Sequence, residues 1–302
     1  MPSETDFLQW LYAQQRASSV VRTPAGDDLA VLNWPGSRDL LLVGIDQVLD
    51  GVHFDSTVHS PRDIGRKAIN RNISDCAAMA CLPVAAVASV ALPRGTSIDF
   101  AKELYLGMQT AGEEFGCSIV GGDTSAWDGK LALSVAIIGK SDGIEPILRS
   151  GAQVGDGVFV SGPLGGSIRG RHLRFIPRVP VARQIAATKK ITAMIDLSDG
   201  LSRDLRQICA ASNVAAVLDQ PNIPIHSDAI AQSAADGRSA IDHAVNDGED
   251  YELLFTAAPD FQHAGCIQIG RVVAAAAGDA PVQIEMDGQR AALPERGWIA
   301  RW

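Results

Sequence analysis

The feature of this sequence that most limits its fold is a series of aspartates beside glycines, at the ends of short apolar runs. Strand ends are where α/β proteins place their functional groups, and a neighbouring glycine lets the backbone approach a phosphate closely. The pattern therefore predicts an α/β protein whose carboxylates gather at strand ends. The segments that carry it are Gly26-Asp27-Asp28, Ile45-Asp46, Gly121-Gly122-Asp123 and Asp196-Leu197-Ser198-Asp199-Gly200.

Each acidic segment also has a simpler interpretation. Glycine–aspartate pairs mark turns, and Asp75 follows Arg71 by four residues, a spacing that allows an ion pair within one helix. His53 could be an ordinary hydrogen-bonded histidine, and Glu249 beside Gly248 could belong to a solvated turn.

Taken together, the acidic segments predict a metal site. Carboxylates that gather in one place repel each other strongly unless cations neutralise them. Mg²⁺ is the natural cation, because it takes hard oxygen ligands and keeps positions open for phosphate oxygens. Aspartates divided between the two halves of the chain thus predict metal-bridged substrates held at a domain interface.

Hydrophobic patterning gives the expected elements: short apolar runs predict strands, and apolar residues three and four apart predict helices. Strands are expected at 29–32, 40–45, 84–92, 119–120, 131–138, 158–160, 194–195, 215–218, 253–256 and 266–269. Helices are expected at 64–80, where Pro83 stops the helix, at 98–115, from 199 to about 211, and at 229–240. Seven glycines lie from Gly151 to Gly170, after a polar turn, and we place a domain boundary before them, giving domains 1–140 and 141–302.

Composition excludes several classes of protein. A chain of 302 residues suits two domains of ordinary size, and its net charge of −9 argues against binding to nucleic acid. No apolar run is long enough to cross a bilayer, so no membrane association is expected, and the acidic N-terminus does not predict a signal peptide. The five cysteines are odd in number and scattered, which predicts reduced thiols in a cytoplasmic protein.

Seven short motifs, in this order, resemble those of the thiamine-monophosphate kinases from about residue 20 to the C-terminus. They are Gly-Asp-Asp at 26–28, Asp-Gly-Val-His-Phe at 50–54, Asn-Ile-Ser-Asp-Cys-Ala-Ala-Met at 72–79, Gly-Gly-Asp-Thr at 121–124, Arg-Ser-Gly-Ala at 149–152, Ile-Asp-Leu-Ser-Asp-Gly-Leu at 195–201 and Gly-Glu-Asp-Tyr-Glu-Leu at 248–253. Each motif alone has low to moderate specificity, whereas the ordered set is specific. The motifs at 50–54 and 248–252 favour this family within its superfamily.

The resemblance implies a two-domain fold like that of aminoimidazole ribonucleotide synthetase: an N-terminal sheet domain that dimerises and a C-terminal α/β domain with a glycine-rich segment. It implies a homodimer that transfers the γ-phosphoryl group of ATP directly to thiamine monophosphate, assisted by several Mg²⁺ ions, and yields thiamine diphosphate. Two other superfamily members fit poorly. Residues 1–27 contain no Cys or Lys, unlike the selenophosphate enzymes, and Arg301-Trp302 stands where the hydrogenase-maturation protein has a cysteine tail.

The resemblance also assigns roles to individual positions. Six aspartates match positions that hold Mg²⁺ in the family: Asp28, Asp46, Asp75, Asp123, Asp196 and Asp199. The positions that match ATP contacts are Tyr105, Gly122, Asp123, Arg149 and Ser198. Those that match contacts to thiamine monophosphate are His53, Glu249 and Trp298, where the indole could also be a partly buried C-terminal anchor.

Two departures from the family pattern bear on the acceptor and on activity. Gly44 and Ile45 stand where the family usually has hydroxyl residues before the aspartate at 46. The segment 167–182 is short and basic, with arginines from Arg169 to Arg183 in or just beyond it, which suits either a solvated loop or a contact with phosphates. The alternatives are another ATP-dependent enzyme of this superfamily with a different acceptor, or a non-catalytic dimer that binds ATP and Mg²⁺.

Overall fold

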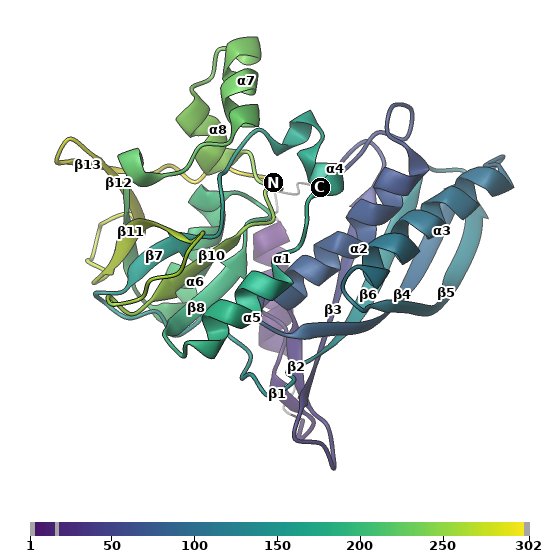
Figure 1. Ribbon diagram of the computed structural model, residues 1–302, viewed down its shortest axis with the longest axis horizontal. Coiled ribbons are helices and arrows are strands. Elements are labelled where there is room, and N and C mark those ends of the chain that lie inside the picture. The colour runs from purple at the N-terminus through teal and green to yellow at the C-terminus, as the bar shows by residue number, and fades with distance from the viewer. Residues whose placement is uncertain (1–3, 16–17, 299–302) are drawn as a thin grey trace.

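The computed structural model describes residues 4–15 and 18–298, which form an α/β protein with two mixed sheets (Figure 1). Both termini, Met1 and the Arg301-Trp302 pair compared above with the hydrogenase-maturation protein, lie outside these residues. In spatial order the first sheet comprises β1 (Val21–Thr23), β2 (Ala30–Asn33), β3 (Leu40–Leu49), β6 (Ala132–Lys140), β4 (Leu82–Pro93) and β5 (Ser118–Trp127). The second comprises β13 (Gln289–Ala292), β12 (Val282–Met286), β9 (Ala215–Asp219), β11 (Ile267–Val273), β7 (Gly157–Val160), β10 (Leu253–Ala257) and β8 (Ile191–Asp196).

Two helices, α2 (Pro61–Ala78) and α3 (Ile98–Glu113), cover one face of the first sheet (Figure 1). Both begin at a serine, Ser60 or Ser97, whose side chain accepts a hydrogen bond from a backbone N–H three residues on. The predicted stop of α2 is wrong. The helix ends at Ala78, Ala80 adopts a left-handed backbone with φ of +54°, and Pro83 lies inside β4.

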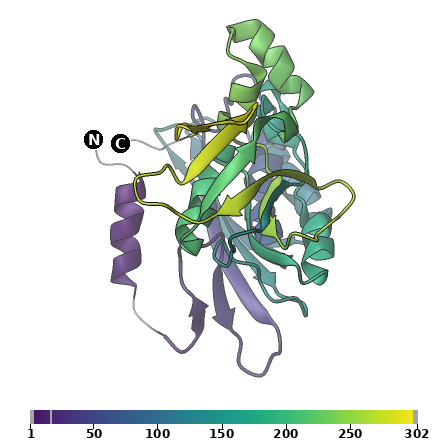
Figure 2. The ribbon, with the colours of Figure 1, turned by 90° about the vertical axis from the view of Figure 1, so that its left-hand side faces the viewer.

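Of the remaining helices, α6 (Leu201–Ser212) packs on the second sheet, and α1 (Glu4–Gln14) stands apart at one side of the molecule (Figure 2). The predicted helix after the aspartate at 199 is α6 (Leu201–Ser212). The helix expected at 229–240 is α7 (Ser227–Asp236), which ends early because Gly237 takes a left-handed φ of +79°, and a further helix that was not expected, α8 (Ala240–Asn246), follows it. The basic segment is helical: η1 (Ser167–Arg169), α4 (Arg171–Arg174) and α5 (Val179–Ala187) follow one another.

The hydrophobic core joins the two halves of the chain. Phe159, Met194 and Phe255 project from one face of the second sheet into the cluster that contains the buried side of α2. The opposite face packs on α6, with Val158 and Ile195 in that second cluster. The layers are therefore the first sheet, a layer with α2 and α5, the second sheet, and α6.

The division into domains 1–140 and 141–302 stays a prediction, consistent with one sheet on each side of it. Among the described residues, no helix is long and apolar enough to cross a membrane.

Glycines allow α2 and α3 to pack closely. A Cβ atom built on Gly65 would overlap the backbone oxygen of Leu104, and one built on Gly107 would overlap the backbone oxygen of Arg62. Backbone atoms cannot yield as a flexible side chain can. This contact fixes α2, which carries Asp75, against α3.

We predict that Gly65→Ala and Gly107→Ala each lower the free energy of unfolding by roughly 1–3 kcal/mol through overpacking. Alanine has the higher helix propensity, so a loss of stability would come from the helix contact alone. Thr110→Ala, at an exposed position of α3, is the control and should be neutral or stabilising. Chemical denaturation measures the three variants, and a stabilised Gly107→Ala protein would contradict the close contact.

Candidate active site

Three carboxylates from distant parts of the chain meet between the two sheets. Asp28 precedes β2, Asp75 lies in the last turn of α2, and Asp196 ends β8. One oxygen from each lies within 4.8 Å of the others. The Oγ of Ser74 donates a 2.5 Å hydrogen bond to Asp196 Oδ2. We call Asp28, Asp75 and Asp196 the carboxylate cluster.

Burial and repulsion by neighbouring carboxylates disfavour the charged forms of Asp75 and Asp196. Burial and the neighbouring carboxylates of Asp46 and Asp196 raise the pKa of Asp75 well above its usual value. Burial and the charge of Asp28 raise the pKa of Asp196 to about 7. Oxygen ligands with surplus negative charge are the donor set of a hard divalent cation, so the cluster fits Mg²⁺ by its chemistry.

Two partly buried arginines partly compensate the negative charge. Arg149 Nη2 lies 2.7 Å from Asp28 Oδ1, and Arg71 Nε lies 2.9 Å from Asp46 Oδ2. Arg71 therefore pairs with Asp46 of β3. The simpler interpretation, an ion pair between Arg71 and Asp75 within one helix, is not what the structure shows. Asp46 stands beside the carboxylate cluster, since its charge acts on both Asp75 and Asp196.

A cavity of about 240 Å³ opens next to the cluster, and it gathers five of the predicted site residues: His53, Ser198, Asp199, Glu249 and Trp298. The rings of His53 and Trp298 lie 5.5 Å apart between centroids. Burial and nearby Arg71 lower the pKa of His53 to about 4, so its imidazole is neutral at pH 7. Trp298 also anchors the C-terminal segment, because its backbone N–H donates to the carbonyl of Asp199 and its backbone carbonyl accepts from the Arg203 side chain.

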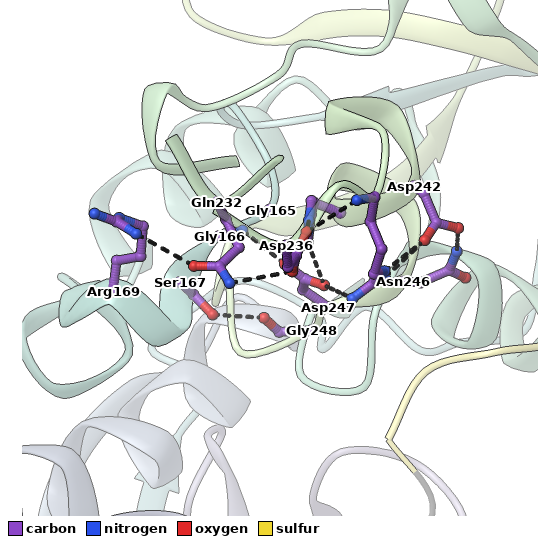
Figure 3. Close-up of polar contacts among 12 residues, drawn as sticks. Gly165, Gly166, Ser167, Arg169, Gln232, Asp236, Asp242, Asn246, Asp247 and Gly248 are labelled. Carbon is purple, nitrogen blue, oxygen red and sulfur yellow. Dashed lines mark hydrogen bonds and ion pairs between the residues drawn. The ribbon is translucent and has the colours of Figure 1, made fainter. Parts of the chain in front are cut away.

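The far wall of this cavity comes from η1, α7 and α8, and the sequence analysis missed it (Figure 3). His243 is buried between two carboxylates, with Nε2 3.2 Å from Asp236 and Nδ1 2.8 Å from Asp247. The backbone N–H of Gly166 donates to Asp247, and Gln232 donates to Asp236. The four-residue spacing of His243 and Asp247 was the signal available in the sequence.

Three predicted ATP contacts lie elsewhere. Tyr105, Gly122 and Asp123 line a separate cavity between α3 and β5. In the sheet, β6 and β4 separate β5 from β3, and the register aligns Asp123 with Ser89, Ser134 and Gln47. At the usual strand spacing this places Asp123 roughly 14 Å from β3 within one chain. One chain therefore does not bring it to the carboxylate cluster.

The departures in β3 leave the aspartate itself in place. A Cβ atom at Gly44 would overlap the side chain of Leu29, so this glycine makes room for a buried leucine. Ile45 projects from the other face of the sheet and is 68% exposed.

The arginines of the basic segment are engaged with the protein itself. Arg171 and Arg178 pair with the buried Asp250 and Glu252, and Arg174 pairs with Asp63 of α2. Arg183 donates to three backbone carbonyls that include Ala80. Four arginines of this segment thus fasten it to the surrounding protein, and a solvated loop is not what forms.

Comparison with known proteins places this arrangement in context. A family model, AIR synthase related protein, N-terminal domain, matches residues 26–141. Thiamine-monophosphate kinase from Rhodopirellula baltica is 43% identical over 263 residues, which cover 85% of this chain and 83% of that protein. That from Aquifex aeolicus is 32% identical over 251 residues, covering 76% and 79%. A solved structure of AaThiL complexed with AMPPCP and TMP matches with a TM-score of 0.86 at 28% identity, covering 98% of this chain and 96% of that one.

We predict that Asp75→Asn stabilises the protein by about 1–2 kcal/mol in the absence of divalent cations, because one buried like charge is removed. The same variant should lose the stabilisation that Mg²⁺ gives the wild type.

Asp196 has a raised pKa in the folded state, so without Mg²⁺ the stability of the wild type should fall as the pH rises from about 4 through 7. Thermal unfolding with and without Mg²⁺ measures these effects.

The control for this variant is Asp279→Asn, in an exposed loop, which should behave as the wild type. An Asp75→Asn protein that still gains the full stabilisation from Mg²⁺ would place the metal elsewhere.

Proposed function

The chain belongs to the thiamine-monophosphate kinase family, and we propose that it transfers the γ-phosphoryl group of ATP to the phosphate of thiamine monophosphate, giving thiamine diphosphate and ADP. The observation that carries the proposal is the carboxylate cluster beside a cavity that holds His53, Glu249 and Trp298. The relative with AMPPCP, an ATP analogue, and TMP bound supports the same pair of substrates. ATP as co-substrate and five free cysteines suit a cytoplasmic enzyme.

The site suits a reaction that needs alignment and charge neutralisation more than a general base. The attacking oxygen belongs to a phosphate that is already ionised at neutral pH, so no proton has to be removed from it. Asp28, Asp75 and Asp196, with Asp46 and Asp199 nearby, would hold the Mg²⁺ ions. Bound Mg²⁺ neutralises the phosphate oxygens and orients the two substrates. Arg149, at the edge of the cluster, supplies a fixed positive charge for ATP phosphates.

The cavity supplies groups suited to the acceptor. Trp298 is 41% exposed and can stack on a flat, positively charged heteroaromatic ring. Glu249 is anionic at neutral pH, since contacts with His172 and Lys67 outweigh its burial and hold its pKa at about 2. Neutral His53 adds no positive charge that would repel a cationic ring. Together they favour a cationic aromatic acceptor that carries a phosphate.

A second copy of the chain would complete the site. The face of the first sheet opposite α2 and α3 exposes apolar side chains, among them Ile45, Val87 and Ile138. A homodimer that buries this face would cover them and would carry Asp123 of one chain toward the carboxylate cluster of the other. This accounts for an aspartate that resembles a metal ligand yet stands about three strands from β3 in its own chain.

The direct test of the reaction measures ADP release together with chromatographic detection of thiamine diphosphate. We expect product only when ATP, Mg²⁺ and thiamine monophosphate are all present, and at least a 100-fold lower rate for Asp199→Asn, because one metal ligand is lost. Stabilisation by ATP and Mg²⁺ without product from this acceptor would support a nucleotide-binding dimer or a different acceptor.

Mixing two inactive variants tests whether two chains build one site. Asp75→Asn and Asp123→Asn should each be inactive alone. When they are unfolded and refolded together, half of the dimers are mixed and each of these holds one intact site, so about a quarter of wild-type activity should return. No recovery, from dimers shown to be mixed, would mean that each site is built within one chain.

A further inference from the structure

A fully buried lysine links the two sides of the acceptor cavity. Lys67 of α2 has an exposed fraction of 0%, yet its Nζ lies 2.7 Å from Glu249 Oε1, 2.6 Å from the carbonyl oxygen of His53 and 2.9 Å from His172 Nδ1. An ammonium group has three donors and no acceptor, so the carbonyl of His53 and the carboxylate of Glu249 accept from it. His172 Nδ1 lies within reach of both partners of the ion pair, 2.9 Å from Lys67 Nζ and 3.3 Å from Glu249 Oε2.

The pair of Lys67 and Glu249 is charged at neutral pH. Burial lowers the pKa of Lys67 to about 8, while the charge of Glu249 opposes that effect. A buried ion pair of this kind is weak evidence for a stabilising role, because its desolvation cost offsets most of its attraction. A fully buried lysine at this position therefore suits a role in orienting its partners, Glu249 and the carbonyl of His53.

What it holds is a strained loop next to the carboxylate cluster. Glu249 and Tyr251 adopt left-handed backbones, with φ of +52° and +53°, which non-glycine residues rarely do. Their N–H groups donate to the carbonyls of Ser198 and Leu197, at 2.8 and 2.9 Å. The loop therefore ties the acceptor cavity to the segment between β8 and α6, and Lys67 fixes the direction of the Glu249 side chain within it.

We propose that Lys67 is a positioning residue for the acceptor: it holds the His53 turn of the first half and the Glu249 carboxylate of the second half in one fixed arrangement. The proposal rests on the function proposed above, in which His53 and Glu249 contact thiamine monophosphate. Lys67 itself does not line the cavity, so it acts through these two residues. His172, from α4, contacts both Lys67 and Glu249, which gives the basic segment a part in shaping the site.

The proposal predicts a selective loss of acceptor affinity. In Lys67→Met, which keeps the length of the side chain and removes its charge, the KM for thiamine monophosphate should rise at least tenfold. The KM for ATP should stay within about twofold, because no ATP-binding position contacts this lysine. Lys190→Met removes an exposed lysine that pairs with Asp260, and it should match the wild type in both constants.

A second variant separates positioning from simple neutralisation of a buried charge. Lys67→Met leaves Glu249 without its partner and should lower Tm, whereas Lys67→Met with Glu249→Gln removes both charges and should recover most of it. We expect the acceptor KM of the double variant to remain raised, above that of Glu249→Gln alone, because the His53 turn has also lost its donor. Recovery of the acceptor KM together with Tm would overturn the proposal, as would equal increases in the KM for ATP and for thiamine monophosphate. Turnover of thiamine monophosphate by the wild type is measured in the same series and tests the proposed function separately.

Discussion

The mutual repulsion of buried carboxylates is the constraint on which the rest of this structure depends. The fold brings Asp28, Asp75 and Asp196 from a loop, a helix and a strand end to within 4.8 Å, although burial and the nearby carboxylates make Asp75 and Asp196 costly to ionise. A cluster of this kind persists only if the surrounding fold holds it in place. The close contact of α2 and α3, the shared hydrophobic core and the arginine pairs all act on the elements that carry the three aspartates. Stability is thereby given up at the place where metal and phosphate are proposed to bind.

The aspartates of the cluster could be predicted from the sequence because they stand beside glycines or inside recognisable motifs at strand and helix ends. The other contributors could not. Lys67 and His172 look like ordinary polar residues in the sequence, and only the fold shows that both are buried against Glu249. The wall formed by Asp236, His243 and Asp247 arises from two short helices where the pattern predicted one.

Two errors in the predicted elements have a common cause. Edge strand β5 was expected to span two residues but extends over Ser118–Trp127, because most of its side chains are exposed and the Gly-Gly-Asp segment within it resembles a turn. The charge of the segment at 167–182 suited either a solvated loop or a contact with phosphates, yet the segment forms short helices whose arginines pair with distant carboxylates. Hydrophobic periodicity reports burial within one chain, and it fails in an exposed edge strand and in a charged segment held by long-range ion pairs.

The most direct measurement locates the metal. Crystals grown with Mn²⁺ in place of Mg²⁺ and with a non-hydrolysable ATP analogue would show the ions by anomalous scattering. We expect ions coordinated by oxygens of Asp28, Asp75 and Asp196, with analogue phosphates bound to the same ions. Manganese absent from these three carboxylates while the analogue is bound, or ions held only by other residues, would contradict the central role given to the carboxylate cluster.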